Sequence, residues 1–543
     1  MRARSRLLSL CSILLGSLAV ATGCGDDATG GAGGAGGAGG ADEGGAAPLI
    51  VETASGKVEG EILGESRRYL GIPYAAPPVG DLRWRAPVPA EPWADTLEVK
   101  TRLPSCSQAN PLNGSFATSS SEDCLTLNIW APKASSATPR PVMFWIHGGA
   151  FVLGSGAESA YDGQILSETT GAIVVTINYR LGPLGFLALS SLEDEDAQHG
   201  SSGNYGFLDQ QAALAWVHDN IAAFGGDPEQ IAIFGESAGG ISVCDHLVSP
   251  ASDGLFQAAI IESGPCDTAL TRDEAHAQGA ALLTATGCDV EADPIACLRG
   301  KTPKELIEAI PPNADFLNPD GPRWSPVVDD YVLTDQPGAS FAAGNFSKVP
   351  LIVGSNSDEA TLFFTLANVS IADEAAFEAL AESFVPGHGA DVVAEYPVAD
   401  YGTAKDAAVA AVSDAAFICP ARRTARAVSS AGVPTYLYQF SYGPTSLLGE
   451  LGAFHEAEVK FVFGVPSQLL PLPLNAEERT LSEHMMSYWT ELLISGAPGD
   501  ANGTLAWPAY EQASDQHLVL DLTLSTGSGL EREHCDFWDT MSL

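Results

Sequence analysis

A serine between two glycines, in the run FGESAGG at residues 234–240, is the strongest candidate for chemistry in the sequence. Gly235, Ser237 and Gly239 form the pattern Gly-x-Ser-x-Gly, which follows an apolar run and precedes a segment of helical character. This is the context of a nucleophile elbow, where a sharp turn exposes a serine hydroxyl. The alternative is a turn of small residues without chemistry. Because a serine hydroxyl is a weak nucleophile, catalysis would require a base elsewhere in the chain.

A second segment, HGGAF at residues 147–151, ends another apolar run in two glycines. Such a segment leaves unblocked backbone N–H groups at the edge of a sheet, where they can bind the oxyanion of a tetrahedral intermediate. His147 is a tempting base. A histidine that begins such a loop usually supports the loop, however, so we expect the base elsewhere.

The elements that must position these residues are short apolar runs, with helical patterns between them. Near-continuous apolar runs are typical of strands buried on both faces of a largely parallel sheet. The clearest helical pattern is FLDQQAALAWVHDNIAAFGG at residues 207–226, with Gly225 and Gly226 as its stop. The alternation predicts an α/β fold with a central, mostly parallel sheet flanked by helices. The runs that predict strands are PVMFWIHGG, AIVVTINYR, IAIFGES, AAIIESG, VPLIVGSN and TYLYQFSY.

Several longer stretches carry a resemblance that covers most of the chain after residue 47. They are YLGIPYAAPPVGDLRWRAP, EDCLTLNIWAP, HGGAF, NYRLGPLGF, GNYGFLDQQAALAWVHDNIAAFGGDP, FGESAGG, GSNSDEATLFF and FHEAEVKFVFG. In this order the sequence resembles the type-B carboxylesterase and cholinesterase family of α/β-hydrolases. The resemblance implies an α/β-hydrolase fold in one large catalytic domain. It also implies a serine hydrolase that cleaves carboxylic esters through an acyl-enzyme intermediate, with no cofactor.

The resemblance assigns a catalytic triad residue by residue. Ser237 matches the nucleophile, Glu359 in SNSDEATLFF matches the acid, and His455 in GAFHEAEVKFVFG matches the base. Their order along the chain is that of α/β-hydrolases. The bare sequence leaves Asp358 open as the acid, and the family pattern favours Glu359. Taken alone, such a glutamate is usually a solvated charge, and a lone histidine is more often structural.

The resemblance also assigns residues around the triad. The oxyanion donors match the N–H groups of Gly149, Ala150 and Ala238, with Ala150 in place of a commoner third glycine. A family network of buried polar groups behind the triad matches Glu236, Ser263 and Glu458. Two structural ion pairs match Arg83 with Glu122 and Arg180 with Asp209.

Ten cysteines are present, of which Cys11 lies in the leader and Cys24 is a candidate for lipidation. The remaining eight are an even number, which suggests disulfides in an exported chain, although sequence alone does not set their pairing. Cys244 and Cys266 match no family pair, and we expect them to pair because both lie close to the nucleophile segment. The resemblance implies three further pairs, namely Cys106 with Cys124, Cys288 with Cys297, and Cys419 with Cys535.

The N-terminus is typical of an export signal. Arg2, Arg4 and Arg6 precede an apolar core, Leu7 to Val20, that is too short to span a bilayer comfortably. Residues 21–24, ATGC, resemble a bacterial lipobox with alanine where leucine is usual. We expect a lipoprotein-type signal at 1–23, a Gly/Ala-rich flexible tether at 24–47, and the catalytic domain at 48–543. Lipidation of Cys24 would anchor the protein in the cell envelope, whereas cleavage without a lipid would release it.

The charge and the motifs of the sequence limit the classes of partner that the protein is expected to bind. The 26 Lys and Arg residues against 68 Asp and Glu residues give a net charge of −42, which repels phosphate backbones and argues against nucleic acid. No HExxH or paired CxxC motif occurs, so the motifs imply no metal. The expected partner is a small-molecule ester. In the family that the sequence resembles, choline specialists carry a tryptophan and lipases a long lid in the first disulfide loop. The matching loop here, between Cys106 and Cys124, is short and lacks tryptophan, so the resemblance argues against both. A lipase and a non-catalytic binding protein are the alternatives.

Overall fold

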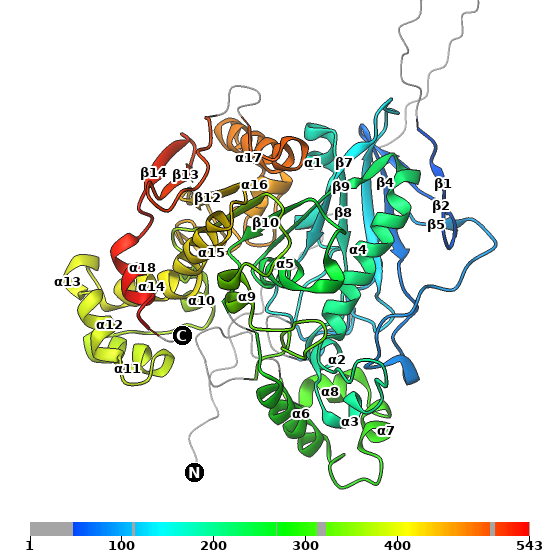
Figure 1. The fold of residues 1–543 in the computed structure, drawn as a ribbon, viewed down its shortest axis with the longest axis horizontal. Coiled ribbons are helices and arrows are strands. Elements are labelled where there is room, and N and C mark those ends of the chain that lie inside the picture. The colour runs from blue at the N-terminus through cyan, green and yellow to red at the C-terminus, as the bar shows by residue number, and fades with distance from the viewer. Residues whose placement is uncertain (1–46, 111–114, 268, 312–321, 500–504, 542–543) are drawn as a thin grey trace, which may run out of the picture. The chain divides into compact units, whose positions relative to one another are not determined.

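The computed structural model describes residues 47–110, 115–267, 269–311, 322–499 and 505–541. The predicted leader, Cys24 and the tether up to residue 46 lie outside this part, so those boundaries stay predictions. The described residues belong to one compact unit. The described part of that unit is built around an 11-stranded sheet (Figure 1).

The middle of the sheet is parallel and its edges are antiparallel. The strand order is β14-β13-β12-β11-β10-β9-β7-β8-β6-β4-β3, and the run from β13 to β8 pairs in parallel throughout. All six predicted strands lie in this parallel run, which confirms the expected fold class. The bounds are β3 Glu61–Leu63, β4 Ser66–Pro73, β6 Thr126–Pro132, β7 Arg140–Ile146, β8 Ile173–Ile177, β9 Gly226–Glu236, β10 Ala258–Glu262, β11 Leu351–Asn356, β12 Thr435–Phe440, β13 Gln516–Leu520 and β14 Ser525–Ser528. A smaller sheet joins β1 Ile50–Thr53, β2 Gly56–Glu59 and β5 Leu97–Glu98.

Both faces of the central sheet are buried, as the continuous apolar runs predict. On β7, Phe144 packs into one apolar cluster with helices of one face, while Met143 and Trp145 pack into a second cluster. The first face is covered by α4 Tyr205–Phe224, α5 Ala238–Val248 and α15 Cys419–Ser430. The second face is covered by α1 Gln164–Thr170, α16 Val459–Phe463 and α17 Ala476–Ser495. The predicted helix is α4, which begins two residues before the expected start and is capped at its C-terminus by Gly225, whose φ is 96°.

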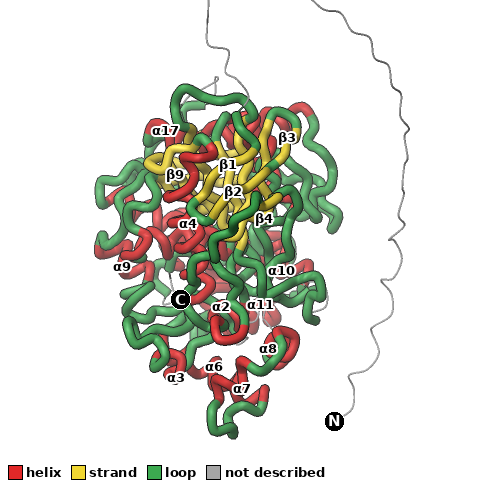
Figure 2. The backbone as a smooth tube through the Cα atoms, turned by 90° about the vertical axis from the view of Figure 1, so that its right-hand side faces the viewer, coloured by secondary structure: helices red, strands yellow, loops and turns green. Residues whose placement is uncertain are grey.

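Most of the remaining helices form two groups outside these layers. Figures 1 and 2 both show α3 Ser190–Glu193, α6 Arg272–Thr286, α7 Pro294–Arg299 and α8 Pro303–Ala309 gathered at one end of the unit. A third apolar cluster joins α11 Glu374–Phe384, α12 Gly389–Glu395 and α14 Ala404–Ser413 with Cys535 and Trp538 of α18 Arg532–Trp538. The other helices are α2 Gly182–Phe186, α9 Pro337–Ala343, α10 Thr361–Leu366 and α13 Val398–Tyr401.

Disulfides and buried ion pairs connect these elements. The four disulfides are Cys106–Cys124, Cys244–Cys266, Cys288–Cys297 and Cys419–Cys535, which confirms the expected pairing. The ion pairs of Arg83 with Glu122 (2.6 Å) and Arg180 with Asp209 (2.7 Å) are also present. Disulfides in this number are typical of an exported or extracellular protein. In the described part of the chain, no helix is long and apolar enough to cross a membrane.

Candidate active site

Ser237 occupies a sharp turn between the end of β9 and the start of α5. Its backbone has φ 56° and ψ −121°, a conformation that residues other than glycine rarely adopt. The Ser237 N–H donates to the carbonyl of Glu262 on β10, at 2.9 Å, which fixes the turn to the sheet. Glu236 and Ala238 are buried, whereas Ser237 is only half-buried. The turn therefore presents the serine at the carboxyl edge of the sheet, as the elbow motif predicts.

The two glycines of the motif are required by close backbone packing. A Cβ on Gly239 would lie 2.0 Å from the carbonyl oxygen of Ile146, and one on Gly235 would lie 2.6 Å from the backbone of Gly239. The first turn of α5 thus packs directly against the backbone of β7 and β9. A side chain at either glycine would push the helix away and change the angle of the elbow.

Glu359 and His455 come from two loops at the same edge of the sheet, after β11 and β12. The Nδ1–H of His455 donates to Oε2 of Glu359 at 2.6 Å. Oε1 of Glu359 accepts from the Ser263 hydroxyl at 2.6 Å and from the Asn356 N–H at 2.7 Å. Glu359 is fully buried, and these donors stabilise its negative charge.

Asp358, the other acid that the bare sequence leaves open, has a different position. Its Oδ2 accepts from the backbone N–H of Ala453 at 3.0 Å, and its own N–H donates to the Ala453 carbonyl at 3.0 Å. Asp358 therefore holds the loop that carries His455, while Glu359 contacts the imidazole ring. This arrangement agrees with the choice of Glu359 that the resemblance implies.

The second ring nitrogen of His455 faces a carboxylate next to the serine. Nε2 lies 3.1 Å from Oε1 of Glu236. Among the described residues, the hydrogen bonds include none between the Ser237 hydroxyl and His455. Contacts of this kind are often long in free enzymes and tighten when substrate binds. The rings of Phe363 and Phe417 enclose the imidazole, with centroids 5.0 Å and 4.8 Å from it.

The buried carboxyl groups around His455 govern its protonation. Burial alone would lower the pKa of His455, but the negative charges of Glu236 and Glu359 outweigh it and raise the pKa to about 10. Burial also raises the pKa of Glu236 well above its usual range and that of Glu458 to about 7. Glu236 and His455 lie close enough that the protonation of one depends on the protonation of the other.

The supporting polar groups behind the triad lie close together. Ser263 contacts Glu458 at 3.4 Å as well as Glu359, and Asn356 Nδ2 donates to Glu458 Oε2 at 2.5 Å. Sequence reasoning missed Asn356, which donates through both its backbone and its side chain. Its place at the end of an apolar strand, beside the predicted acid, is the signal that could have found it. Glu236 differs from the other two members of the predicted network because it faces His455 directly.

The glycine loop after β7 runs against the elbow. A Cβ on Gly148 would lie 2.8 Å from Oε2 of Glu236 and 3.2 Å from Cβ of Ser237. Gly149 and Ala150 both have positive φ, 104° and 52°, and Ala150 exposes its methyl group. The hydrogen bonds of the described residues include none from the N–H groups of Gly149, Ala150 or Ala238. These three N–H groups are therefore free to donate hydrogen bonds to a bound group.

His147 supports this loop, as expected. Its Nδ1 donates to the carbonyl of Gly148 at 2.8 Å, and its ring stacks on Tyr179 with centroids 4.4 Å apart. Burial lowers the pKa of His147 to about 4. The residue is a neutral support at neutral pH.

Comparisons with known proteins agree with this geometry. A profile of the carboxylesterase family matches residues 47–538. The chain belongs to the carboxylesterase family. It is 36% identical to the para-nitrobenzyl esterase of Bacillus subtilis (strain 168) over 496 residues, which cover 89% of this chain and 97% of the relative. It is 34% identical to the acetylcholinesterase of Bungarus fasciatus over 546 residues, covering 91% of this chain and 87% of that one.

A solved structure titled PNB esterase superimposes on this carboxylesterase with a TM-score of 0.77 at 36% identity, covering 90% of this chain and 99% of that chain. The α/β-hydrolase fold is therefore confirmed. The carboxylesterase is a serine hydrolase that cleaves carboxylic esters, and the binding-protein alternative is not favoured.

Proposed function

We propose that Ser237, His455 and Glu359 are the catalytic triad of this carboxylesterase and that Gly149, Ala150 and Ala238 form its oxyanion hole. The observation that carries the assignment is the 2.6 Å hydrogen bond between His455 and Glu359 beside a serine held in a positive-φ elbow. With Nδ1 held by Glu359, Nε2 is the nitrogen left for proton transfer.

The reaction follows from these positions. His455 removes the hydroxyl proton as Ser237 attacks the ester carbonyl, and Glu359 stabilises the imidazolium that forms. The backbone N–H groups hold the oxyanion of the tetrahedral intermediate. His455 then gives its proton to the leaving alcohol, and an acyl-enzyme remains on Ser237. Water, deprotonated by His455, attacks the acyl-enzyme and releases the acid.

The test is the turnover of an activated aryl ester by a Ser237→Ala variant. We expect kcat to fall by a factor of roughly 10⁴ to 10⁶, as for other triad nucleophiles. Ser383→Ala, at an exposed position on α11, is the matched control and should behave as the unmodified enzyme. An organophosphate should label the enzyme at Ser237, located by peptide mass spectrometry. Undiminished turnover, or labelling at another serine, would refute the assignment of Ser237 as the nucleophile.

The proposed substrates are small-molecule esters with short acyl chains. The disulfide loop from Cys106 to Cys124 spans only 18 positions, which leaves little chain for a long lid. The similarity to a para-nitrobenzyl esterase supports aryl and benzyl esters as first probes. A series of para-nitrophenyl esters tests the proposal. A sharp rise in rate above the solubility limit of a long-chain ester would favour the lipase alternative.

We also propose that the exported protein is anchored by a lipid on Cys24, with residues 25–47 as a tether. The support is the lipobox-like ATGC run and the absence of apolar periodicity in the segment that follows. Incorporation of labelled palmitate by the full chain, but not by a Cys24→Ser variant, is the expected result. Unlabelled protein in the medium would indicate simple secretion.

A further inference from the structure

Three side chains with metal-binding groups lie together where the C-terminal helix α18 meets the segment between α14 and α15. They are Asp414, Glu531 and His534, and one ligand atom of each lies within 4.8 Å of the others. They form the one such group of three found among the described residues. None belongs to the proposed triad or its polar network. We propose that these three residues bind a divalent transition metal ion, with Zn²⁺ as the reference ion.

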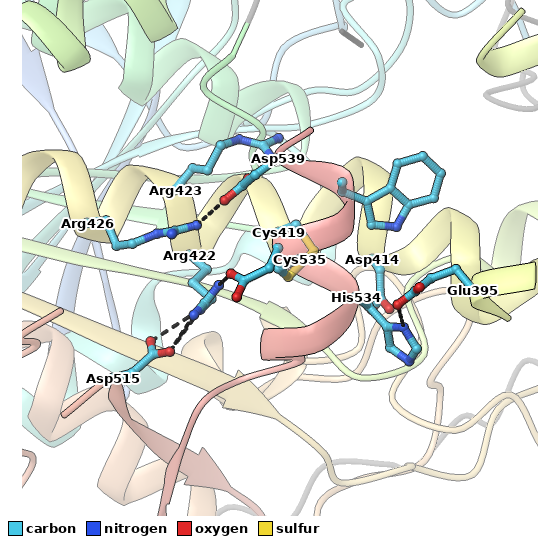
Figure 3. Close-up of a disulfide and its surroundings, with 12 residues drawn as sticks. Glu395, Asp414, Cys419, Arg422, Arg423, Arg426, Asp515, His534, Cys535 and Asp539 are labelled. Carbon is cyan, nitrogen blue, oxygen red and sulfur yellow. Dashed lines mark hydrogen bonds and ion pairs between the residues drawn. A yellow bond between two sulfur atoms is a disulfide. The ribbon is translucent and has the colours of Figure 1, made fainter. Parts of the chain in front are cut away.

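Asp414 is a buried carboxylate that lacks a cationic partner. It is 5% exposed, and its Oδ2 accepts a hydrogen bond of 2.7 Å from the Tyr396 hydroxyl. In the described part of the chain, no lysine or arginine pairs with it. Asp515, also buried, pairs with Arg422 at 2.5 Å, and Figure 3 shows the two carboxylates on opposite sides of one disulfide. A cation beside Asp414 would pair with this carboxyl group as Arg422 pairs with that of Asp515.

His534 has an acidic partner of the kind that ligand histidines usually have. Its ring stacks on Tyr396 with centroids 4.3 Å apart, and its Nδ1 lies 3.0 Å from Oε1 of Glu395. Figure 3 shows this contact. A carboxylate that accepts from one ring nitrogen is the usual outer partner of a ligand histidine and leaves the other nitrogen for the metal. The Tyr401 hydroxyl lies 3.3 Å from Nε2, and a metal bond of about 2.1 Å would replace this long contact.

A disulfide holds the two ligand-bearing segments together. Asp414 begins the π-helix Asp414–Ile418, which leads directly into Cys419, and Cys535 follows His534. The Cys419–Cys535 bond keeps the two Cα atoms 5.1 Å apart. The ligands are therefore close together before an ion arrives, which lowers the ordering cost of binding.

An entry path exists on the surface side. Glu531 and His534 line a surface depression that also includes Gly529 and Arg532. Arg532 does not neutralise the site, because its guanidinium pairs with Asp515 at 3.1 Å. Solvent can therefore reach Glu531 and His534, the two outer members of the cluster.

The ligand set determines the class of ion. Two carboxylates and one imidazole match Zn²⁺ or a similar transition metal. Ca²⁺ and Mg²⁺ prefer oxygen ligands alone, so the imidazole argues against them. The bound ion would tie α18 to the end of α14 and stabilise the third apolar cluster, in addition to the disulfide.

The test uses the full, untagged protein after treatment with a chelator and buffer exchange. Calorimetric titration with ZnCl₂ should give one equivalent of binding, and excess Zn²⁺ should raise Tm by roughly 2–5 °C. CaCl₂ should produce neither effect. Absence of Zn²⁺ binding, or a preference for Ca²⁺, would overturn the proposal.

Substitutions at the proposed site test whether Zn²⁺ binds there. His534→Gln and Asp414→Asn should each weaken Zn²⁺ binding at least ~100-fold, and Glu395→Gln should weaken it by about 10–100-fold through the orientation of His534. His388→Gln is the matched control, because His388 contacts Asp391 at 2.9 Å on the surface without belonging to such a group of three. If Asp414→Asn does not fold, His534→Gln and Glu395→Gln still decide the question. Unchanged binding in His534→Gln would place the ion elsewhere and refute the site.

Discussion

His147 and His455 are both buried close to the nucleophile elbow, yet burial leads to opposite protonation. Burial lowers the pKa of His147 to about 4 because only the Gly148 carbonyl opposes it. The same desolvation acts on His455, but the carboxylates of Glu236 and Glu359 raise its pKa to about 10. Desolvation disfavours an imidazolium at either position, so the difference lies in the partners.

The comparison indicates what distinguishes the proposed base from a supporting histidine. His147 is held by a carbonyl and by the ring of Tyr179, which fix the ring without favouring a positive charge. His455 is held by a carboxylate that compensates the charge gained when it accepts a proton. A histidine can therefore lie next to the serine and still be only a support.

The strongest test of the comparison removes each histidine in turn. His455→Ala should lower kcat on an activated aryl ester by a factor of roughly 10⁴ to 10⁶, because the proposed acceptor of the serine proton is lost. His147→Gln should lower kcat by at most about 100-fold, the cost of a slightly misplaced oxyanion loop. Steady-state rates measure both.

A matched check of folding accompanies this experiment, with circular dichroism and Tm measured for both variants. A folded His147→Gln enzyme that is as inactive as His455→Ala would contradict the division of roles.

The second test replaces each of the two neighbouring acids, Glu359 and Asp358, by its amide in a separate variant. Glu359→Gln should lower kcat about 10⁴-fold, because the amide can no longer stabilise the imidazolium of His455. Asp358→Asn should retain most of the activity, because its contacts are with the backbone of Ala453. Single-turnover rates of acylation provide the measurement. Equal losses in the two variants would mean that Asp358 shares the role of the acid.

The sequence predicts the local features of the site better than the contacts between distant residues. The elbow is local, so the glycines around Ser237 and the strand–turn–helix pattern suffice to predict it. Glu359 and His455 lie 96 residues apart, and only the family resemblance connects them. The contact of Glu236 with His455 and the two donations of Asn356 depend on how side chains pack at the sheet edge. No spacing rule predicts such contacts, because a glutamate next to the serine can face solvent or the base.

The last test concerns pH. The base acts only when neutral, so kcat/KM should rise with pH as His455 loses its proton, and the raised pKa places this acid limb above the ordinary value of 6.5. Glu236→Gln removes a negative charge next to Nε2, so the pKa of His455 should fall. The acid limb should then move to lower pH by roughly 1–3 pH units. His147→Gln, the control, should leave the limb in place, because His147 is already neutral at those pH values.

The outcome separates two states of the buried carboxyl pair. A shift to lower pH in Glu236→Gln means that Glu236 carries a negative charge in the free enzyme and holds the proton on His455. An unmoved limb would mean that burial keeps Glu236 protonated, in line with the raised pKa of its own carboxyl group. Glu359 alone would then distinguish His455 from His147, and a single hydrogen-bonded carboxylate would be enough to turn a buried histidine into a base.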